Sequence, residues 1–283
     1  MSLKGMLLGR QAYKAHGNAD YETAMKLYEQ AYDEGMKDPR FILGYTVLLL
    51  RDEQYAKARE ILVALQNNPA LTPALKSQLY VNYAAAVYRM GEIDKGIRLL
   101  ERQHKQGPTG LIYQTLGCLY VEKYDIENTP DFDALEKAAA ERAEEMPPEP
   151  EEPVVEKFPS LTPAGETEKP SLRRQWQDGI DRAEAFILES VDYDEEDSVV
   201  LDNYAQFLYR VKGDKEAAKE WFDKAIKEKD SQIDTLWFLS RYDLEKGDRK
   251  AALEKVEKLA AGRFSPLNHV TREMAQAELE RLR

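Results

Sequence analysis

The sequence predicts an all-α fold, a solenoid built from about six helix-turn-helix units, on three observations. A helical stripe made by Ala24, Tyr28 and Ala31 returns around Ala58, which lies 34 residues after Ala24. Glycine followed by a polar residue separates pairs of amphipathic stretches, as at Gly213. Charged residues make up 33% of the chain, a proportion that is normal for stacked amphipathic helices.

The units can be followed along the chain. Each of the stretches 80–108, 201–230 and 235–262 contains a helix, a glycine turn and a second helix. The turn glycines suit the left-handed conformation that ends a helix, and the next residue suits the following N-terminus. A small residue recurs in each second helix, where it lets the paired helices approach closely. These residues are Ala24, Ala58, Gly96, Ala183, Ala218 and Ala252.

The repeated unit resembles the tetratricopeptide repeat, a helix-turn-helix of about 34 residues. The first-helix motif of that family occurs intact as Leu116, Gly117 and Tyr120. Its second-helix motif occurs twice, as Ala24/Tyr28/Ala31 and as Ala218/Phe222/Ala225. The chain departs from the family at Gly96, in a stretched first turn, and in a split fourth unit. The resemblance implies a right-handed superhelix closed by a C-terminal capping helix.

The expected organisation has four parts. Residues 1–125 hold three repeats and the first helix of the fourth, and 126–170 form an acidic, proline-rich insert. Residues 171–266 hold the second helix of repeat four with repeats five and six, and 267–283 form the capping helix. Within the insert, 132–146 predicts an extra helix, whereas the prolines of 147–170 exclude regular structure. The insert is a mobile loop, a strand that folds back to regulate access, or a docking motif.

The charge of the chain is concentrated in the insert. Residues 126–170 carry 13 acidic and 4 basic side chains, a net charge of −9 out of −12 for the whole chain. No stretch is apolar enough for a bilayer, no signal peptide is recognisable, and Cys118 is the only cysteine. We therefore expect a soluble cytoplasmic protein that binds neither membranes nor nucleic acid, since its pI is near 5.0.

Catalysis is not predicted. The chain lacks the metalloprotease, nucleophile-elbow and dinucleotide motifs, and Gly91 begins a glycine pattern without the lysine of a phosphate loop. His16, His104 and His269 fall in three distant units, so neither a metal site nor a cofactor is expected. Cys118 is interpreted as a packing or groove-lining residue.

The resemblance implies that the first helices line a concave groove that binds peptides. Basic, amide and aromatic side chains fall on that face: Arg40, Arg51, Asn82, Tyr88, Arg89, Asn203, Tyr204, Arg210, Trp237 and Arg241. The same stripes contribute only three acids, Glu122, Asp234 and Glu245. The arginines would bind carboxylates, the asparagines a peptide backbone, and the aromatic rings apolar side chains.

The predicted function is non-catalytic binding of a partner protein through an acidic or C-terminal segment, with the insert as a regulator. The alternative is a structural scaffold that self-assembles through the solenoid ends or the insert, so that the groove has no role. An enzyme would require a site that carries no recognisable motif.

Overall fold

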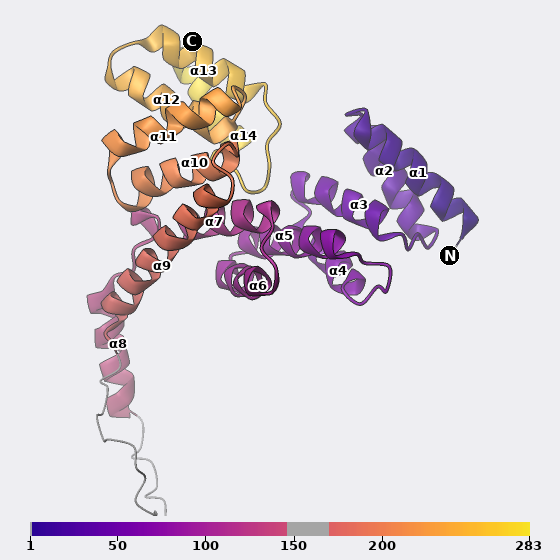
Figure 1. The fold of residues 1–283 in the computed structure, drawn as a ribbon, viewed down its shortest axis with the longest axis horizontal. Coiled ribbons are helices and arrows are strands. Elements are labelled where there is room, and N and C mark those ends of the chain that lie inside the picture. The colour runs from indigo at the N-terminus through magenta and orange to yellow at the C-terminus, as the bar shows by residue number, and fades with distance from the viewer. Residues whose placement is uncertain (1, 146–169) are drawn as a thin grey trace, which may run out of the picture.

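A computed structural model describes residues 2–145 and 170–283, and all regular elements in that part of the chain are helices (Figure 1). Most of them pack as consecutive pairs, which confirms the predicted all-α class. The six pairs are α1 (Leu3–Gly17) with α2 (Tyr21–Asp33), α3 (Pro39–Arg51) with α4 (Tyr55–Leu65), α5 (Pro73–Arg89) with α6 (Ile93–Gln106), α7 (Gly110–Tyr124) with α9 (Leu172–Tyr193), α10 (Ser198–Gln206) with α11 (Lys215–Glu228), and α12 (Ile233–Glu245) with α13 (Arg249–Ala260).

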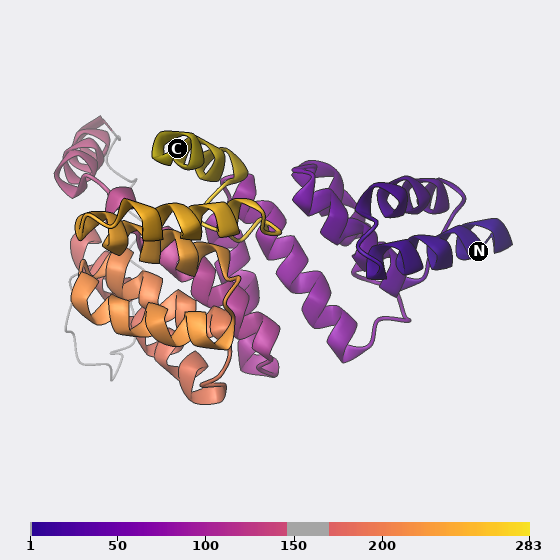
Figure 2. The ribbon, with the colours of Figure 1, turned by 90° about the horizontal axis from the view of Figure 1, so that it is seen from above.

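Four further elements complete the described fold. A π-helical turn, η2 (Phe207–Val211), extends α10, and a short 3-10 turn, η1 (Ile126–Asn128), follows α7. Helix α8 (Phe132–Glu145) precedes α9, and α14 (Arg272–Leu282) ends the chain. Figures 1 and 2 both show α1 and α2 at one end of the array and the yellow C-terminal helices toward the other. Helix α8 extends away from the array beyond α9 (Figure 1).

The small residues of the second helices lie where paired helices meet, as the sequence predicted. All five alanines of this set are completely buried, and Gly96 is also buried. A Cβ added at Gly96 would lie 3.2 Å from both the Ala84 carbonyl oxygen and Leu119 Cδ1. Such a distance is shorter than ordinary van der Waals contact, so this position favours glycine over the usual alanine.

In the five pairs whose helices follow each other directly, the turn contains one residue with positive φ. Gly91, Gly213 and Gly247 have φ values of 79°, 71° and 79°, as predicted for helix-ending glycines. In the first two pairs the same position is held by Ala19 and Glu53, with φ of 61° and 58°. A side chain is less favourable there than glycine, so these two turns lack the glycine that marks the other three in the sequence.

The described part of the insert packs on α9. Helix α8 confirms the extra helix expected at 132–146, and Phe132 lies against Trp176 with ring centroids 6.2 Å apart. Helix α9 is longer than the expected 176–190, because Ser171 caps it by accepting a hydrogen bond from the Arg174 amide. The proline-rich stretch lies outside the described residues, apart from Pro170.

The C-terminal helix starts later than predicted, at Arg272 rather than near 268. Thr271 has an extended backbone and its hydroxyl accepts a hydrogen bond from the Met274 amide, which sets the N-terminus of α14. Leu279 and Leu282 then pack with Val256 of α13, so α14 covers the last helix pair. The residues before Thr271 belong to a different structure, described next.

Candidate functional site

The connection between α13 and α14 crosses the face formed by the first helices. We call residues 261–271 the strap. Figure 1 shows it as a yellow loop reaching from the C-terminal helices toward α5. Leu267 packs against two core clusters, one centred on α3 and the other on α7. A cavity of about 100 Å³ is lined by Pro266 and Leu267 of the strap, Arg51 of α3 and Asn82 of α5. The strap therefore occupies the middle of the predicted groove.

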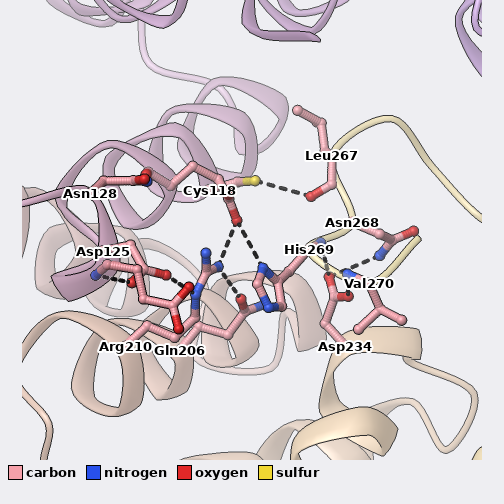
Figure 3. Close-up of polar contacts among 12 residues, drawn as sticks. Cys118, Asp125, Asn128, Gln206, Arg210, Asp234, Leu267, Asn268, His269 and Val270 are labelled. Atoms are coloured by element: carbon pink, nitrogen blue, oxygen red, sulfur yellow. Dashed lines mark hydrogen bonds and ion pairs between the residues drawn. The ribbon is translucent and has the colours of Figure 1, made fainter. Parts of the chain in front are cut away.

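The strap is held by side chains of the helices beneath it (Figure 3). Cys118 Sγ donates to the Leu267 carbonyl oxygen at 3.1 Å. The buried carboxylate of Asp234 accepts from Asn268 Nδ2 at 2.9 Å and from the backbone amides of His269 and Val270 at 3.2 and 3.0 Å. These contacts satisfy polar groups that would otherwise be buried without partners.

A charged network lies beside these contacts (Figure 3). Arg210 Nη1 is 2.6 Å from Glu122 Oε1, and Arg210 Nε is 2.7 Å from Asp125 Oδ2. His269 Nδ1 lies 3.6 Å from Glu122 Oε1, and its ring stacks on Phe238. Burial opposes ionisation of Glu122, but the adjacent His269 and the ion pair with Arg210 outweigh it and lower the pKa of Glu122 to about 2. The network therefore contains an ionised Glu122.

A second pair of buried carboxylates, Asp202 and Asp234, links α10 to α12. Burial, together with the neighbouring charge of Asp234, raises the pKa of Asp202 to about 7. Burial also raises the pKa of Asp234, although its three hydrogen-bond donors favour the ionised form. Asp202 Oδ1 lies 2.5 Å from the Thr235 hydroxyl, and Asp202 Oδ2 accepts from Gln206. Of the two, Asp202 is the carboxyl that favours the protonated form, because Asp234 accepts hydrogen bonds from three N–H groups, which favour its ionised form.

The two asparagines among the ten predicted groove residues are buried, and their amides are used within the chain. Asn82 Nδ2 donates to Thr46 Oγ1 at 3.2 Å, and Asn203 Nδ2 donates to the Gln114 carbonyl oxygen at 2.8 Å. The amides therefore connect neighbouring first helices, and each already has a partner for the hydrogen bond that a peptide backbone would require.

The three aromatic groove residues each contact a different side chain. The Tyr88 hydroxyl donates to Glu122 Oε2 at 2.9 Å. The Tyr204 ring meets Trp221 edge-on, with centroids 4.8 Å apart. Trp237 lies near the C-terminal end of the array, where the Arg241 guanidinium covers its ring at 4.1 Å.

The five arginines divide into two groups. Arg210 is buried in the network described above, with 7% of its surface exposed. Arg241 pairs with Glu278 at 2.6 Å, and the exposed Arg40 pairs with Asp38 at 2.7 Å. Arg51 and Arg89 form no ion pair with any residue that the structure describes.

Arg51 and Arg89 come together although they lie in different repeats. They are the last residues of α3 and α5, and both line one small cavity beside the strap. Arg51 Nη1 and Arg89 Nε are buried without a hydrogen-bond partner in the described part of the chain. Buried donors without acceptors cost free energy, so these two guanidiniums are suited to an anion.

Sequence reasoning missed the strap as part of this site. Asp234 was counted only as an acid on the groove stripe, whereas it anchors residues 34 to 36 positions further along. Thr271, a good helix N-cap, was the available signal, because it places Asn268–Val270 outside a helix. The absence of a partner for Arg51 and Arg89 could not be read from sequence.

Comparisons with known proteins agree with the helix-pair architecture. Residues 15–77 match a family model described as tetratricopeptide repeat. No curated protein matches the sequence. Human IFIT1, solved as a dimer with m7Gppp-AAAA, has a similar structure with a TM-score of 0.54 and 16% identity, covering 92% of this chain and 49% of that chain. The chain thus spans about half the length of the IFIT1 chains that it matches, and the likeness concerns the fold.

A second solved structure matches over nearly its whole length. This tetratricopeptide repeat protein from Parabacteroides merdae has a TM-score of 0.43 and 13% identity, covering 99% of this chain and 98% of that chain. Independently of these likenesses, none of the described helices is long and apolar enough to cross a bilayer.

Proposed function

Because the chain is a tetratricopeptide repeat protein, a member of a family of generally non-catalytic interaction scaffolds, we propose that it binds a partner protein. The ligand is an acidic or C-terminal segment, held on the concave face at the ends of α3 and α5. The observation that carries this proposal is the pair Arg51 and Arg89, each of which has one buried guanidinium nitrogen, Nη1 of Arg51 and Nε of Arg89, without an acceptor in the described part of the chain. Arginine binds carboxylates through two parallel hydrogen bonds, so an acidic segment supplies what this site lacks.

The strap limits where such a segment lies. Pro266 and Leu267 of the strap lie beside α3 and α5 near Asn82. The Leu267 carbonyl also accepts a hydrogen bond from Cys118 of α7. The helix ends at Arg51 and Arg89 adjoin the strap and border a cavity that Tyr55 also lines. The proposed segment therefore binds beside the strap, toward α4. Arg40, Arg210 and Arg241, which have acidic partners within the chain, are not included in this site.

Affinity capture tests the proposal. The intact chain is compared with Arg51→Glu/Arg89→Glu, and the captured protein is then titrated directly by fluorescence anisotropy. We expect the double variant to weaken binding at least about tenfold, because reversing charge at a site of this kind costs more than about 1.4 kcal/mol. Arg174→Glu, which changes an exposed arginine on α9, is the matched control. Equal affinity of all three proteins would place the binding surface elsewhere.

Regulation by the acidic insert remains part of the proposal, and most of the insert lies outside the described residues. Deleting residues 147–169 tests it. If the insert competes for the arginines, the deletion should tighten partner binding, and added salt should reduce the difference between the two chains, because exposed ion pairs are screened over about 8–10 Å. Identical affinity at low salt would exclude this competition.

One observation favours the alternative function, self-assembly through the solenoid ends. The outer face of α1 exposes Leu3 and Leu7, which are 68% and 49% accessible, at the N-terminal end of the array. Light scattering over a range of concentrations separates the two functions. If the chain is monomeric at every concentration and the Leu3→Lys/Leu7→Lys variant has the same mass, self-assembly is excluded. Binding of a partner protein would then be the function.

A further inference from the structure

Two adjoining cavities lie where the strap leaves α13 and enters α14. The larger has a volume of about 430 Å³ and the smaller about 60 Å³. Arg51, Phe264 and Arg272 line both, so the two cavities share a wall. A volume of about 10–15 Å³ accommodates one water, so the smaller cavity has room for a group the size of a carboxylate.

The larger cavity is mainly apolar. Tyr21 and Met25 of α2, Leu48 of α3 and Phe264 of the strap contribute to its wall. Its volume falls within the range of about 300–1,000 Å³ that is usual for small-molecule sites, in which apolar surface is combined with polar groups that orient the ligand. An aromatic or branched aliphatic group has the size and polarity that fit this space.

Four arginines surround the two cavities, and aromatic rings hold two of them. The Arg263 guanidinium lies 4.2 Å from the centroid of Tyr21, and that of Arg272 lies 5.1 Å from the centroid of Phe264. Arg51 and Arg89 complete the set. None of the four forms an ion pair within residues 2–145 and 170–283.

The charge of the lining favours one negative charge on the ligand. Five basic side chains, the four arginines and Lys26, line the cavities with four acidic ones: Glu22, Asp52, Glu53 and Glu273. Five minus four leaves a net charge of +1. Glu22 pairs with Lys26 at 2.7 Å, and Asp52 accepts from Gln54 at 2.6 Å, so two of the acids have partners of their own. A monoanion balances this lining, whereas a phosphate dianion would overcompensate it.

We propose that these two cavities together bind a small carboxylic acid with an aromatic or branched aliphatic body. Its carboxylate enters the smaller cavity between Arg51, Arg89 and Arg272, and its apolar body fills the larger cavity against Leu48 and Phe264. The proposal goes beyond binding of a partner segment, because its ligand is a free small molecule and eight of the residues that line the two cavities lie between positions 263 and 273. The strap is thereby a wall of the site.

Phenylpropionate is a suitable probe, with phenylpropanamide as its uncharged analogue. Both are titrated into the full chain by calorimetry and by amide NMR. We expect one saturable site for the acid and at least about tenfold weaker binding of the amide, since hydrogen bonds to charged groups contribute that much discrimination. Arg51→Gln and Arg272→Gln should each weaken the acid about tenfold or more, and Phe264→Ala should weaken both compounds. Arg174→Gln, which changes the exposed arginine of α9, should have no effect.

Three outcomes would overturn the proposal: no binding at millimolar acid, equal binding of acid and amide, or acid binding that both arginine variants leave unchanged. Arg272 is exposed, so its replacement does not threaten folding, and circular dichroism verifies this for each variant. A hexapeptide that ends in phenylalanine with a free carboxylate distinguishes the source of the ligand. If it binds tenfold tighter than phenylpropionate, the ligand is a chain terminus and the small-acid proposal fails. That result would leave the proposal that the chain binds a partner protein unaffected.

Discussion

Replacing Arg210 with methionine should destabilise the C-terminal half of the array severely. The guanidinium contacts Glu122 at 2.6 Å, Asp125 at 2.7 Å and Gln206 Oε1 at 2.9 Å, and only 7% of the residue is exposed. Methionine has a similar length and preserves packing, but two carboxylates lose their buried counter-charge. Removing one member of a buried ion pair costs about 3–5 kcal/mol, so we expect a loss of that size in the free energy of unfolding.

Urea unfolding followed by tryptophan fluorescence measures this loss. All three tryptophans, Trp176, Trp221 and Trp237, lie C-terminal to Asp125, so the signal reports on the affected half of the chain. A repeat array can unfold in parts, and the local signal is therefore more informative than the total helical content. Arg174→Met, at an exposed position of α9, should change the free energy by less than about 0.5 kcal/mol.

A rescue variant tests the electrostatic reasoning directly. In Arg210→Met combined with Glu122→Gln and Asp125→Asn, the uncompensated charges are gone while the side-chain shapes are kept. The triple variant should recover at least about half of the loss, since the penalty comes from buried charge rather than from lost packing. A loss below about 1 kcal/mol for Arg210→Met, or no recovery in the triple variant, would refute this explanation.

Three further predictions concern Asp202, Gly179 and the strap. Folding raises the pKa of Asp202 from 3.8 to about 7. The stability that this residue contributes to the fold is therefore fully present below about pH 4 and is lost as the pH rises through 7. The wild-type chain should lose about 2–3 kcal/mol of unfolding free energy between pH 5 and 8, whereas Asp202→Asn should lose little. Gly179→Ala places a Cβ against the buried Tyr124 hydroxyl and should cost about 1–3 kcal/mol by urea unfolding, while Gly110→Ala, which meets no atom within 4 Å, should be nearly neutral. Asn268→Ala should speed hydrogen exchange of the strap amides at least about tenfold without changing exchange in α1, because Asp234 loses one of its donors.

Much of the helical framework could be predicted because its determinants are local. The turn at Gly247 combines a positive φ with an Asp248 side chain that caps α13, and both features can be read from two adjacent residues. The fourth unit, which the insert divides, can be recognised from Ala183, because this residue lies 35 positions before Ala218. Both alanines are fully buried. Local spacing and turn chemistry are sufficient in such cases.

The site was less predictable because its determinants lie far apart in the chain. Which arginine has a free guanidinium depends on neighbours such as Glu122 and Asp125, which lie 88 and 85 residues from Arg210. Helical register places Arg51 and Arg210 on the same face, but only the packing of the strap and of η2 determines which one is neutralised. The course of the strap itself depends on the carboxylate of Asp234, and no local pattern encodes that contact.

Photo-crosslinking tests most directly the central claim, that a partner segment binds at the ends of α3 and α5. Benzoylphenylalanine is introduced in place of Tyr55, which lines the cavity between Arg51 and Arg89, and, as a control, in place of the exposed Tyr193 at the end of α9. We predict that the captured partner crosslinks at position 55 through an acidic or C-terminal segment. The yield of this crosslink should be much lower when the same chain also carries Arg51→Glu/Arg89→Glu. Crosslinking at position 193 with none at position 55 would contradict the account.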